Sequence, residues 1–465
     1  MRESTVAEAS TREPVCTHLP ATSWRTEPLP RPSGGLRPGR VRRWVIRHGL
    51  PRLLLRVMTW AGSLVGSLLF DRGNQEQLYD LHRRIRAKGR LVGGVVALAT
   101  GHHRTTVELL RDPTYHAGAT SSRVASCAMR HGVAPDAVGP LDAPSLLVVD
   151  PPEHPRYRRL VNKVFTARAV AAMGPDIARI ADGLLDAFPG TGVVDLVPAY
   201  AKRLPVAVIA HLMGIPESML DQFLSWSDRA APALDLGLPY REYLVADQAL
   251  HETNRWLREH FQRVRNGNGD DLLSRLVRIV DDDDQFTDDE LLATVQLLLA
   301  AGFVTIVDMI ANGAVLLLRH PRQLAELRAD PSGWPNAVEE ILRYESPVQL
   351  TARFATERAT LAGRELRRGR AIVAILGAAN RDPEVFEDAD VFDIRRPNAR
   401  DHVAFSRGLH HCLGSGLARL EGEIGFRALF ERYPDMTLLG GPVRRPGAVL
   451  RGYSSVPVRL AAGVR

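Results

Sequence analysis

Several features are scarce in this sequence or missing from it. Only three of its 465 residues are cysteine, which excludes a disulfide framework and indicates a reducing compartment, the cytoplasm. Residues 44–70 are apolar, but three arginines interrupt them, and the uncharged remainder is shorter than the roughly 20 residues of a membrane span. No internal repeat and no Gly/Ser linker follow residue 75, and no flavin or nicotinamide motif is evident. These absences favour one large soluble globular domain.

The excess of positive charge is confined to the N-terminus. The chain has 60 Lys and Arg against 53 Asp and Glu, a formal charge of +7. Residues 1–56 contain eleven Arg and four Glu and neither Lys nor Asp, so the rest of the chain holds 49 basic and 49 acidic residues. A case for nucleic-acid binding would rest on this arm alone, and we do not expect it.

The first residues are rich in Pro, Arg, Ser and Gly without a hydrophobic period, a composition that cannot bury enough apolar surface to fold. We therefore expect residues 1–45 to form a disordered basic arm and residues 46–465 a single catalytic domain. The pair Arg42–Arg43 faintly suggests an export signal. A basic arm leading into an amphipathic surface helix is favoured over that signal and over membrane contact of the arm, and translation from Met58 stays open.

Beyond residue 75 the hydrophobic pattern is mainly helical. Apolar residues recur at intervals of three and four over several long segments, namely 171–188, 205–225, 242–263, 290–318 and 413–430. Two β-branched runs, Leu91–Leu98 and Ala371–Leu376, are typical of strands. The sequence therefore predicts a mostly α fold with small β-sheets.

The most informative stretch is Phe405–Gly414, with the sequence FSRGLHHCLG. Cys412 precedes an amphipathic helix, whose free N–H groups and dipole would lower the pKa of the thiol and stabilise its thiolate. Such a thiolate is a nucleophile, a zinc ligand or an axial haem ligand. A nucleophile lacks a local base and orienting group. Zinc would need further ligands, and although His410 and His411 are near, no CxxC pair accompanies them.

The spacing F-x-x-G-x-H-x-C-x-G resembles the haem-binding loop of the cytochrome P450 family, the haem-thiolate monooxygenases. Four other segments match in the right order, from about Leu91 to Leu460, and the likeness is closest to soluble actinobacterial members. The resemblance implies the cytochrome P450 fold, haem b held by Cys412 between this loop and an oxygen-activating helix, and Phe405 and Gly414 in the cofactor loop. One departure is Ser406, where the family usually has Gly.

Glu340 and Arg343 lie one helical turn apart, about 70 residues before the cysteine loop. Alone this spacing is weak, because most such pairs are solvated surface contacts. By resemblance it matches the family's buried Glu–Arg pair, completed by Arg396 or by His402. The role implied is structural and needed for haem incorporation.

Four basic residues match the positions that bind the haem propionates in the family. A buried carboxylate needs Arg or His donors. His154 and Arg158 stand one turn apart after Asp150-Pro151-Pro152, and the two remaining matches, Arg353 and His410, come from distant segments.

The segment Ala300–Thr305 resembles the oxygen-activating helix of the family. Ala301 and Gly302 match its small residues, and Thr305 matches its alcohol. The position of the usual acid is Val304, which can neither relay a proton nor hydrogen-bond water. Protons would then come through another water chain, or from peroxide if peroxide is the oxidant. The third alternative is that oxygen activation is slow. Asp308 is a candidate relay, although pairing on the far side of the helix is favoured for it.

The resemblance implies a medium-sized hydrophobic substrate in an apolar pocket. Its lining would include residues 115–145 as an access loop, residues 205–250, the oxygen-activating helix and the turn Tyr453–Ser455. Individual candidates on and beyond that helix are Leu299, Phe303, Val304 and Leu350.

Electrons would come from an acidic ferredoxin with its NAD(P)H-dependent reductase. The ferredoxin would dock on a basic surface formed by Arg159, Lys163, Arg407 and Arg419. The function expected is O2-dependent hydroxylation. A peroxide-driven or radical-coupling haem-thiolate oxidase is the alternative that Val304 keeps open, and a non-catalytic haem protein is disfavoured by Thr305.

Overall fold

The computed structural model describes residues 38–73, 75–93, 97–118, 139–142, 144–162, 165–282 and 286–461. The α-helices within these ranges are α1 (Pro38–Trp44), α2 (Leu50–Trp60), α3 (Leu64–Phe70), α4 (Leu78–Ala87), α5 (His103–Arg111), α7 (Glu153–Asn162), α8 (Ala167–Ala172), α9 (Gly174–Asp186), α10 (Arg203–Leu212), α11 (Leu220–Ala230), α12 (Tyr240–Arg265), α13 (Leu272–Asp282), α14 (Asp288–Arg319), α15 (Pro321–Ala329), α16 (Trp334–Tyr344), α17 (Leu376–Ala379) and α18 (Ser415–Arg432).

The strands of the described residues form small sheets. They are β1 (Val92–Gly93), β2 (Ala97–Thr100), β3 (Tyr115–His116), β4 (Gly192–Asp195), β5 (Leu350–Ala355), β6 (Ala359–Leu361), β7 (Arg364–Leu366), β8 (Ala371–Ile375), β9 (Thr437–Leu438), β10 (Val443–Arg444), β11 (Tyr453–Ser455) and β12 (Pro457–Leu460). The largest sheet has the order β1-β2-β8-β5-β3, in which only β2 and β8 run parallel. A three-stranded sheet β4-β12-β9 and the hairpins β6-β7 and β10-β11 complete the set.

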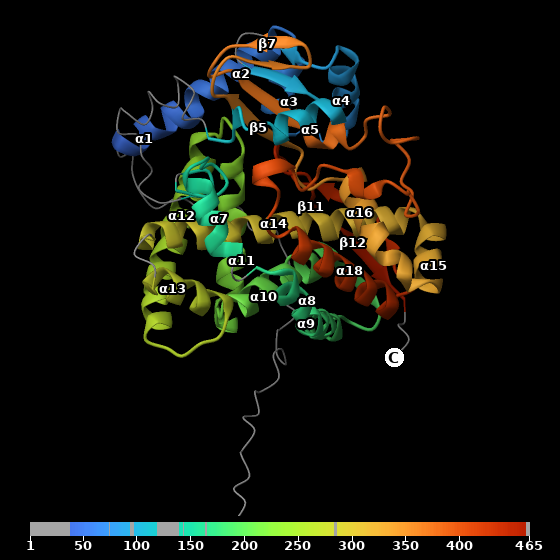
Figure 1. Ribbon diagram of the computed structural model, residues 1–465. Helices are drawn as coiled ribbons and strands as arrows, with labels where there is room; N and C mark the ends of the chain where they lie inside the picture. Colours follow the sequence, from blue (N-terminus) through green and yellow to red (C-terminus); the bar gives the residue numbers. More distant parts are fainter. Residues whose placement is uncertain are drawn as a thin grey trace, which may run out of the picture.

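The long helix α14 runs across the middle of the molecule (Figure 1). Thr287 and Glu290 cap its start reciprocally, side chain to backbone, which fixes where the helix begins. Around it lie α10, α16 and α18, while the largest sheet with α2, α3, α4 and α5 forms the upper part of Figure 1. In the part of the chain that is described, α14 alone is long and apolar enough to cross a membrane, and 61% of its most apolar window is buried, as in a core helix.

The mostly α architecture with small sheets confirms the fold class that the sequence predicts. The helices expected over 242–263, 290–318 and 413–430 correspond to α12, α14 and α18. The segment 205–225 is two helices instead of one, because Gly214 adopts a φ of +61° and Pro216 follows, so the chain turns between α10 and α11. The run Leu91–Leu98 was expected as one strand and contains parts of two, β1 and β2, which pair antiparallel.

The first described residues are helical, although the sequence prediction placed them in the arm. The arm was expected to reach residue 45, yet α1 starts at Pro38 and a π-helical turn, Val45–Gly49, joins it to α2. Trp44, the last residue of α1, ties this helix to the body of the protein, because its indole donates a 2.8 Å hydrogen bond to the Leu238 carbonyl oxygen. The rest of the expected arm lies outside the described residues.

Candidate functional site

The cysteine loop is held in shape by its own backbone and by α5. The Cys412 amide donates a 2.9 Å hydrogen bond to the Phe405 carbonyl oxygen, which closes the loop just before α18. Gly408 has a φ of +70°, and a Cβ there would overlap the carbonyl oxygen of Leu110 at the end of α5. Only glycine fits both demands. Gly414 stands at the N-cap of α18, so Cys412 lies at the start of that helix.

The Cys412 thiol is accessible to solvent although protein surrounds it on most sides. Burial raises the pKa of the thiol, whereas the Gly414 N–H and the positive charges of Arg158 and Arg419 oppose that rise. The sequence predicts a lowered thiol pKa from the helix N-terminus alone. The N–H group and the two guanidinium groups act in the predicted direction, and burial acts against them.

The four basic residues predicted from the sequence come together near this loop. The rings of His154 and His410 are 4.4 Å apart, and the Arg158 guanidinium donates a 2.8 Å bond to the His411 carbonyl oxygen. His154 is buried, and neither of its ring nitrogens has a hydrogen-bond partner among the described residues. Burial, followed by the charges of His410 and Arg158, lowers the pKa of His154 to about 4. Unpaired donors of this kind require a partner that accepts hydrogen bonds.

Arg353 on β5 carries the fourth positive charge of this group. Its guanidinium is buried and, within the described part of the chain, donates only to Thr351 Oγ1 at 3.3 Å and to the Ala352 carbonyl oxygen at 2.8 Å. Burial lowers its pKa to about 10, opposed by the charge of Asp150. A buried guanidinium without a direct ion pair is costly. An anionic ligand with carboxylates would offset that cost, so the donor set together with the thiol fits a haem with two propionates.

Asp150 belongs to the same cluster, although no role for it was predicted from the sequence. Its carboxylate accepts bonds from the backbone N–H groups of Ala117 and Gly118, at 2.9 and 2.7 Å, and lies 3.2 Å from His410 Nε2. Burial alone would raise its pKa, but His410 and the two N–H groups outweigh burial and lower it. The contact joins segments 260 residues apart, so no local pattern could have indicated it.

The helix α14 has one accessible face in an otherwise buried surface. Ala301 is exposed and Thr305 is half-buried, while Leu299 and Phe303 are buried on the opposite side of the helix. The Thr305 hydroxyl donates a 2.7 Å bond to the Ala301 carbonyl oxygen. Gly302 is half-buried and Val304 is buried at the edge of this face, and two leucines that the sequence reasoning missed, Leu297 and Leu298, are half-buried on it.

Glu340 and Arg343 on α16 are fully buried and form a two-bond ion pair. The guanidinium nitrogens lie 2.6 and 2.7 Å from the two carboxylate oxygens. Arg396 adds a third contact, with its Nε 3.3 Å from Glu340. Of the two partners considered from the sequence, Arg396 therefore contacts Glu340, and His402 does not.

His402 pairs with the neighbouring carboxylate instead. Its Nε2 lies 3.0 Å from Glu339, which also accepts a 2.8 Å bond from Arg419 and lies 3.2 Å from Arg400. Burial raises the pKa of Glu339, but His402 and Arg419 outweigh it and bring the value to about 2. This cluster ties α16 to the cysteine helix α18, and two adjacent glutamates in the sequence were its only local signal.

Asp308 is fully buried on α14 and forms an ion pair with Arg445. Burial raises its pKa to about 6, against the charges of Arg445 and Arg444. The backbone of Gly452, just before β11, lies so close that a Cβ would overlap the carboxylate. The pairing favoured from the sequence is therefore present, but Asp308 stands one helical turn after Val304 on the same side of α14 and not on its far side.

Ser406 occupies a backbone position that favours glycine. Its φ is +60°, and its buried hydroxyl has no hydrogen-bond partner. A left-handed conformation costs a non-glycine residue about 1 kcal/mol or more.

We therefore expect Ser406→Gly to raise the thermal unfolding midpoint, with a gain of about 1 kcal/mol in the free energy of unfolding. The matched control is Ser454→Gly in β11, where the backbone is extended and the loss of a side chain should lower stability by about 0.5 kcal/mol. A lower midpoint for Ser406→Gly would show that the hydroxyl has a role that its present contacts do not reveal.

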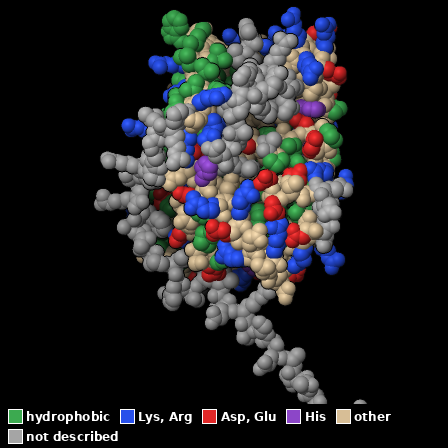
Figure 2. All heavy atoms as spheres, turned by 90° about the vertical axis from the view of Figure 1, so that its left-hand side faces the viewer, with side chains coloured by type: hydrophobic (Ala, Val, Ile, Leu, Met, Phe, Trp, Pro, Cys, Tyr) green, Lys and Arg blue, Asp and Glu red, His purple; other side chains and the backbone are tan. Residues whose placement is uncertain are grey.

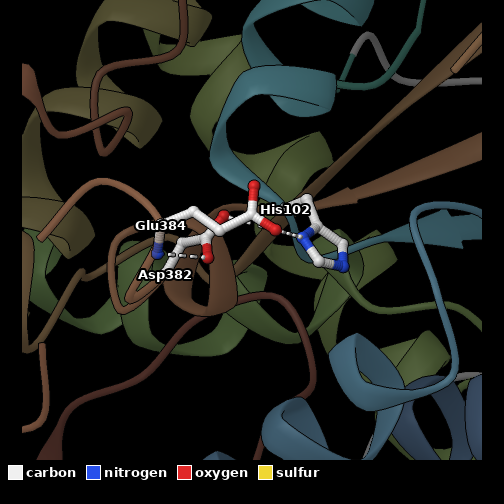
Figure 3. Close-up of side chains that lie close together, drawn as sticks. All are labelled: His102, Asp382 and Glu384. Atoms are coloured by element: carbon white, nitrogen blue, oxygen red, sulfur yellow. Dashed lines mark hydrogen bonds and ion pairs between the residues drawn. The ribbon is translucent and has the colours of Figure 1, made fainter.

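A second group of polar residues lies away from the cysteine loop (Figure 3). His102 Nδ1 is 3.7 Å from oxygens of both Asp382 and Glu384, a spacing compatible with metal ligands. Asp382 already accepts a 2.8 Å bond from the His103 N–H at the start of α5, and Arg90 lies 3.1 Å from Glu384. The group therefore caps α5 and has cationic partners in place.

The predicted basic surface is only partly brought together. Arg159 on α7 is exposed. Arg407 donates to backbone oxygens, among them that of His402 at 2.8 Å, and Arg419 is held by Glu339. Lys163 lies outside the described residues.

Comparisons with known proteins agree with this geometry. A family model described as Cytochrome P450 matches residues 335–436, a range that contains the Glu–Arg pair and the cysteine loop. The chain is 41% identical over 423 residues to a putative cytochrome P450 140 of Mycobacterium tuberculosis, covering 90% of this chain and 97% of the relative. It is 42% identical over 323 residues to the 6-deoxyerythronolide B hydroxylase of Saccharopolyspora erythraea, covering 67% of this chain and 76% of the relative. The solved structure of ligand-free CYP164A2 from Mycobacterium smegmatis superposes with a TM-score of 0.77 at 34% identity, over 85% of this chain and 99% of that one.

Proposed function

Since the chain belongs to the cytochrome P450 family and is an oxidoreductase of the monooxygenase class, we propose that it hydroxylates a medium-sized hydrophobic molecule. O2 would be the oxidant, haem b the cofactor, and a separate ferredoxin with its NAD(P)H-dependent reductase the electron source. The observation that carries the proposal is the accessible Cys412 thiol beside buried, underpaired basic side chains. The low cysteine content, three in 465 residues, supports a cytoplasmic location.

Within this proposal, Cys412 is the axial ligand, and His154, Arg158, Arg353 and His410 bind the two propionates. When bound, the haem-thiolate group activates oxygen, because the thiolate donates electron density to the iron. Arg158 and Arg419 favour the thiolate form of the cysteine, and the loop backbone fixes its direction. Two carboxylates would also supply the hydrogen-bond acceptors that the His154 ring lacks.

The accessible face of α14 supplies the oxygen site of the proposal. Thr305 would hold and pass a proton through its hydroxyl, and the small side chains at Ala301 and Gly302 leave room beside it. Val304 is buried and carries no proton, and Asp308 is engaged by Arg445. Proton delivery therefore depends on Thr305 and water alone, which favours slow or poorly coupled oxygen activation.

The substrate pocket is proposed to lie along the same face. Its lining residues on α14 would be those that remain accessible, namely Leu297, Leu298 and Ala301. Leu350 at the start of β5 is a further candidate. Leu299 and Phe303 are core residues in this arrangement. One relative carries the name of a 6-deoxyerythronolide B hydroxylase, and a hydrophobic substrate suits an apolar lining.

The direct test of the proposal is a spectral titration of the holoprotein against hydrophobic ligands, followed by turnover with ferredoxin, reductase and NAD(P)H. A hydroxylated product with these electron donors supports the proposal. Turnover with peroxide alone, and none with the electron donors, would support the peroxide-driven alternative that Val304 keeps open.

We expect Val304→Asp to raise the amount of product formed per NAD(P)H severalfold, because a carboxyl group beside Thr305 adds a proton donor. The matched control is Val304→Asn, which has nearly the same shape and polarity but no acid, and should give no gain. Product and NAD(P)H consumption are measured together at saturating substrate. Equal coupling in the wild type and in Val304→Asp, Val304→Glu and Val304→Asn would contradict this explanation of position 304.

A further inference from the structure

The helix α2 presents a row of large hydrophobic side chains to solvent. Leu53 is 60% and Trp60 is 90% exposed, and Leu50, Leu54 and Val57 are exposed as well. The face of the molecule that carries α1 and α2 shows hydrophobic side chains gathered at its upper end, with Lys and Arg side chains beside them (Figure 2). Exposed clusters of this kind usually mark an interaction site.

The exposed side chains share one side of the helix. At 100° per residue, positions 50, 53, 54, 57 and 60 fall within an arc of about 120°. The opposite side is already used, because Leu55 is buried in a core with Val65 and Leu68 of α3. The two helices touch closely, since a Cβ at Gly66 would lie 2.8 Å from the Cβ of Met58. The outer arc therefore has no partner among the described residues.

Polar contacts fix α1 and α2 to the body of the protein. Arg52 donates a 2.8 Å bond to the Gly237 carbonyl oxygen, and Arg47 pairs with Asp142. Arg40 lies 3.4 Å from Asp247 on α12. The apolar arc is thus held in place before any partner arrives, so binding costs little ordering entropy.

The charge of this segment has a single sign. Residues 38–60 contain six arginines and neither Asp nor Glu. A second copy of this chain would bring the same cations against each other if the two arcs met. A surface with negative charge and an apolar interior would complement both the cations and the arc.

We propose that α2 docks the protein on the surface of an anionic lipid membrane. The helix lies in the interface with its outer arc among the acyl chains and the exposed Arg56 near the headgroups. Its eleven residues span about 17 Å, too short to cross a hydrocarbon core of about 30 Å. Trp60 at its end has the ring and N–H that favour the boundary between lipid and water.

The test is vesicle flotation of the full-length holoprotein, with phosphatidylcholine vesicles and with vesicles that also contain phosphatidylglycerol. Binding is expected to the anionic vesicles, and to weaken with salt. The double variant Leu53→Ser, Trp60→Ser should bind them at least about tenfold more weakly. The matched control is Val391→Ser, Val443→Ser, which removes two other apolar side chains that are 53% and 55% exposed. Equal unfolding midpoints and haem spectra show that both variants are folded.

Three results would overturn the proposal. The first is no binding to anionic vesicles. The second is binding that the double variant leaves unchanged, which would assign the contact to another segment, such as residues 1–37. The third is a wild-type dimer that the double variant converts into a monomer, because the partner of α2 would then be a second copy. Brominated lipids add a direct readout, since they should quench a fluorescence component that is absent from Trp60→Phe.

Discussion

Replacing Cys412 by serine is expected to abolish the long-wavelength Soret band of the reduced carbon monoxide complex. That band requires a thiolate ligand, and a serine hydroxyl offers neither the negative charge nor the polarisable sulfur. The loop should keep its shape in the variant, because the closing hydrogen bond runs from the backbone N–H of residue 412 to the Phe405 carbonyl oxygen. Product formation should fall by roughly a hundredfold or more, about 2.7 kcal/mol or more in activation free energy.

The control for Cys412→Ser is the same substitution at the two other cysteines. Cys16→Ser and Cys127→Ser should leave the band unchanged, since only Cys412 stands in the loop. Two histidines, His410 and His411, precede Cys412 and are the other ligands at hand. A band that persisted in Cys412→Ser would mean that the ligand assignment is wrong.

Glu340→Gln is expected to lower the free energy of unfolding by about 3–5 kcal/mol. The substitution keeps the shape of the side chain but removes the negative charge that faces two buried guanidinium groups, those of Arg343 and Arg396. Both cations would then be buried without a carboxylate. Denaturant or thermal unfolding measures the loss, and the haem content of the purified protein should fall with it.

A surface pair provides the comparison for Glu340→Gln. Glu326 lies 3.0 Å from Arg395, and both side chains are largely exposed. Glu326→Gln should change stability by no more than about 1 kcal/mol. If Glu340→Gln changed the free energy of unfolding as little as Glu326→Gln, the buried pair would not be structural. Turnover per bound haem should be nearly unchanged in Glu340→Gln, because the pair does not touch the proposed oxygen site.

The features best predicted from the sequence were those with strong local patterns. The periodicity of α12 and α18 and the residue spacing of the cysteine loop do not depend on distant contacts. Pairing across the chain could not be predicted in this way. Asp150 meets His410 and Glu339 meets His402 only after folding, and each partner alone looks like an ordinary surface residue.

The accessible side of α14 was also hard to predict from the sequence. This helix is apolar nearly all round, so its sequence carries little information on which side meets the core. Leu299 and Phe303 were candidates for the pocket because they lie near Thr305 in sequence. A helix that is hydrophobic on every side needs its packing partners to reveal which residues stay accessible, and those partners come from α10, α16 and α18.

The contact between Asp308 and Gly452 has a consequence for the engineering of this protein. Gly452 directly precedes β11, which is a strand where the sequence predicted a turn beside the pocket. Any side chain at 452 would collide with the carboxylate of Asp308 on α14. Larger residues at 452 should therefore be selected only together with a shorter residue at 308. Libraries that vary both positions at once should recover combinations that single-site libraries discard.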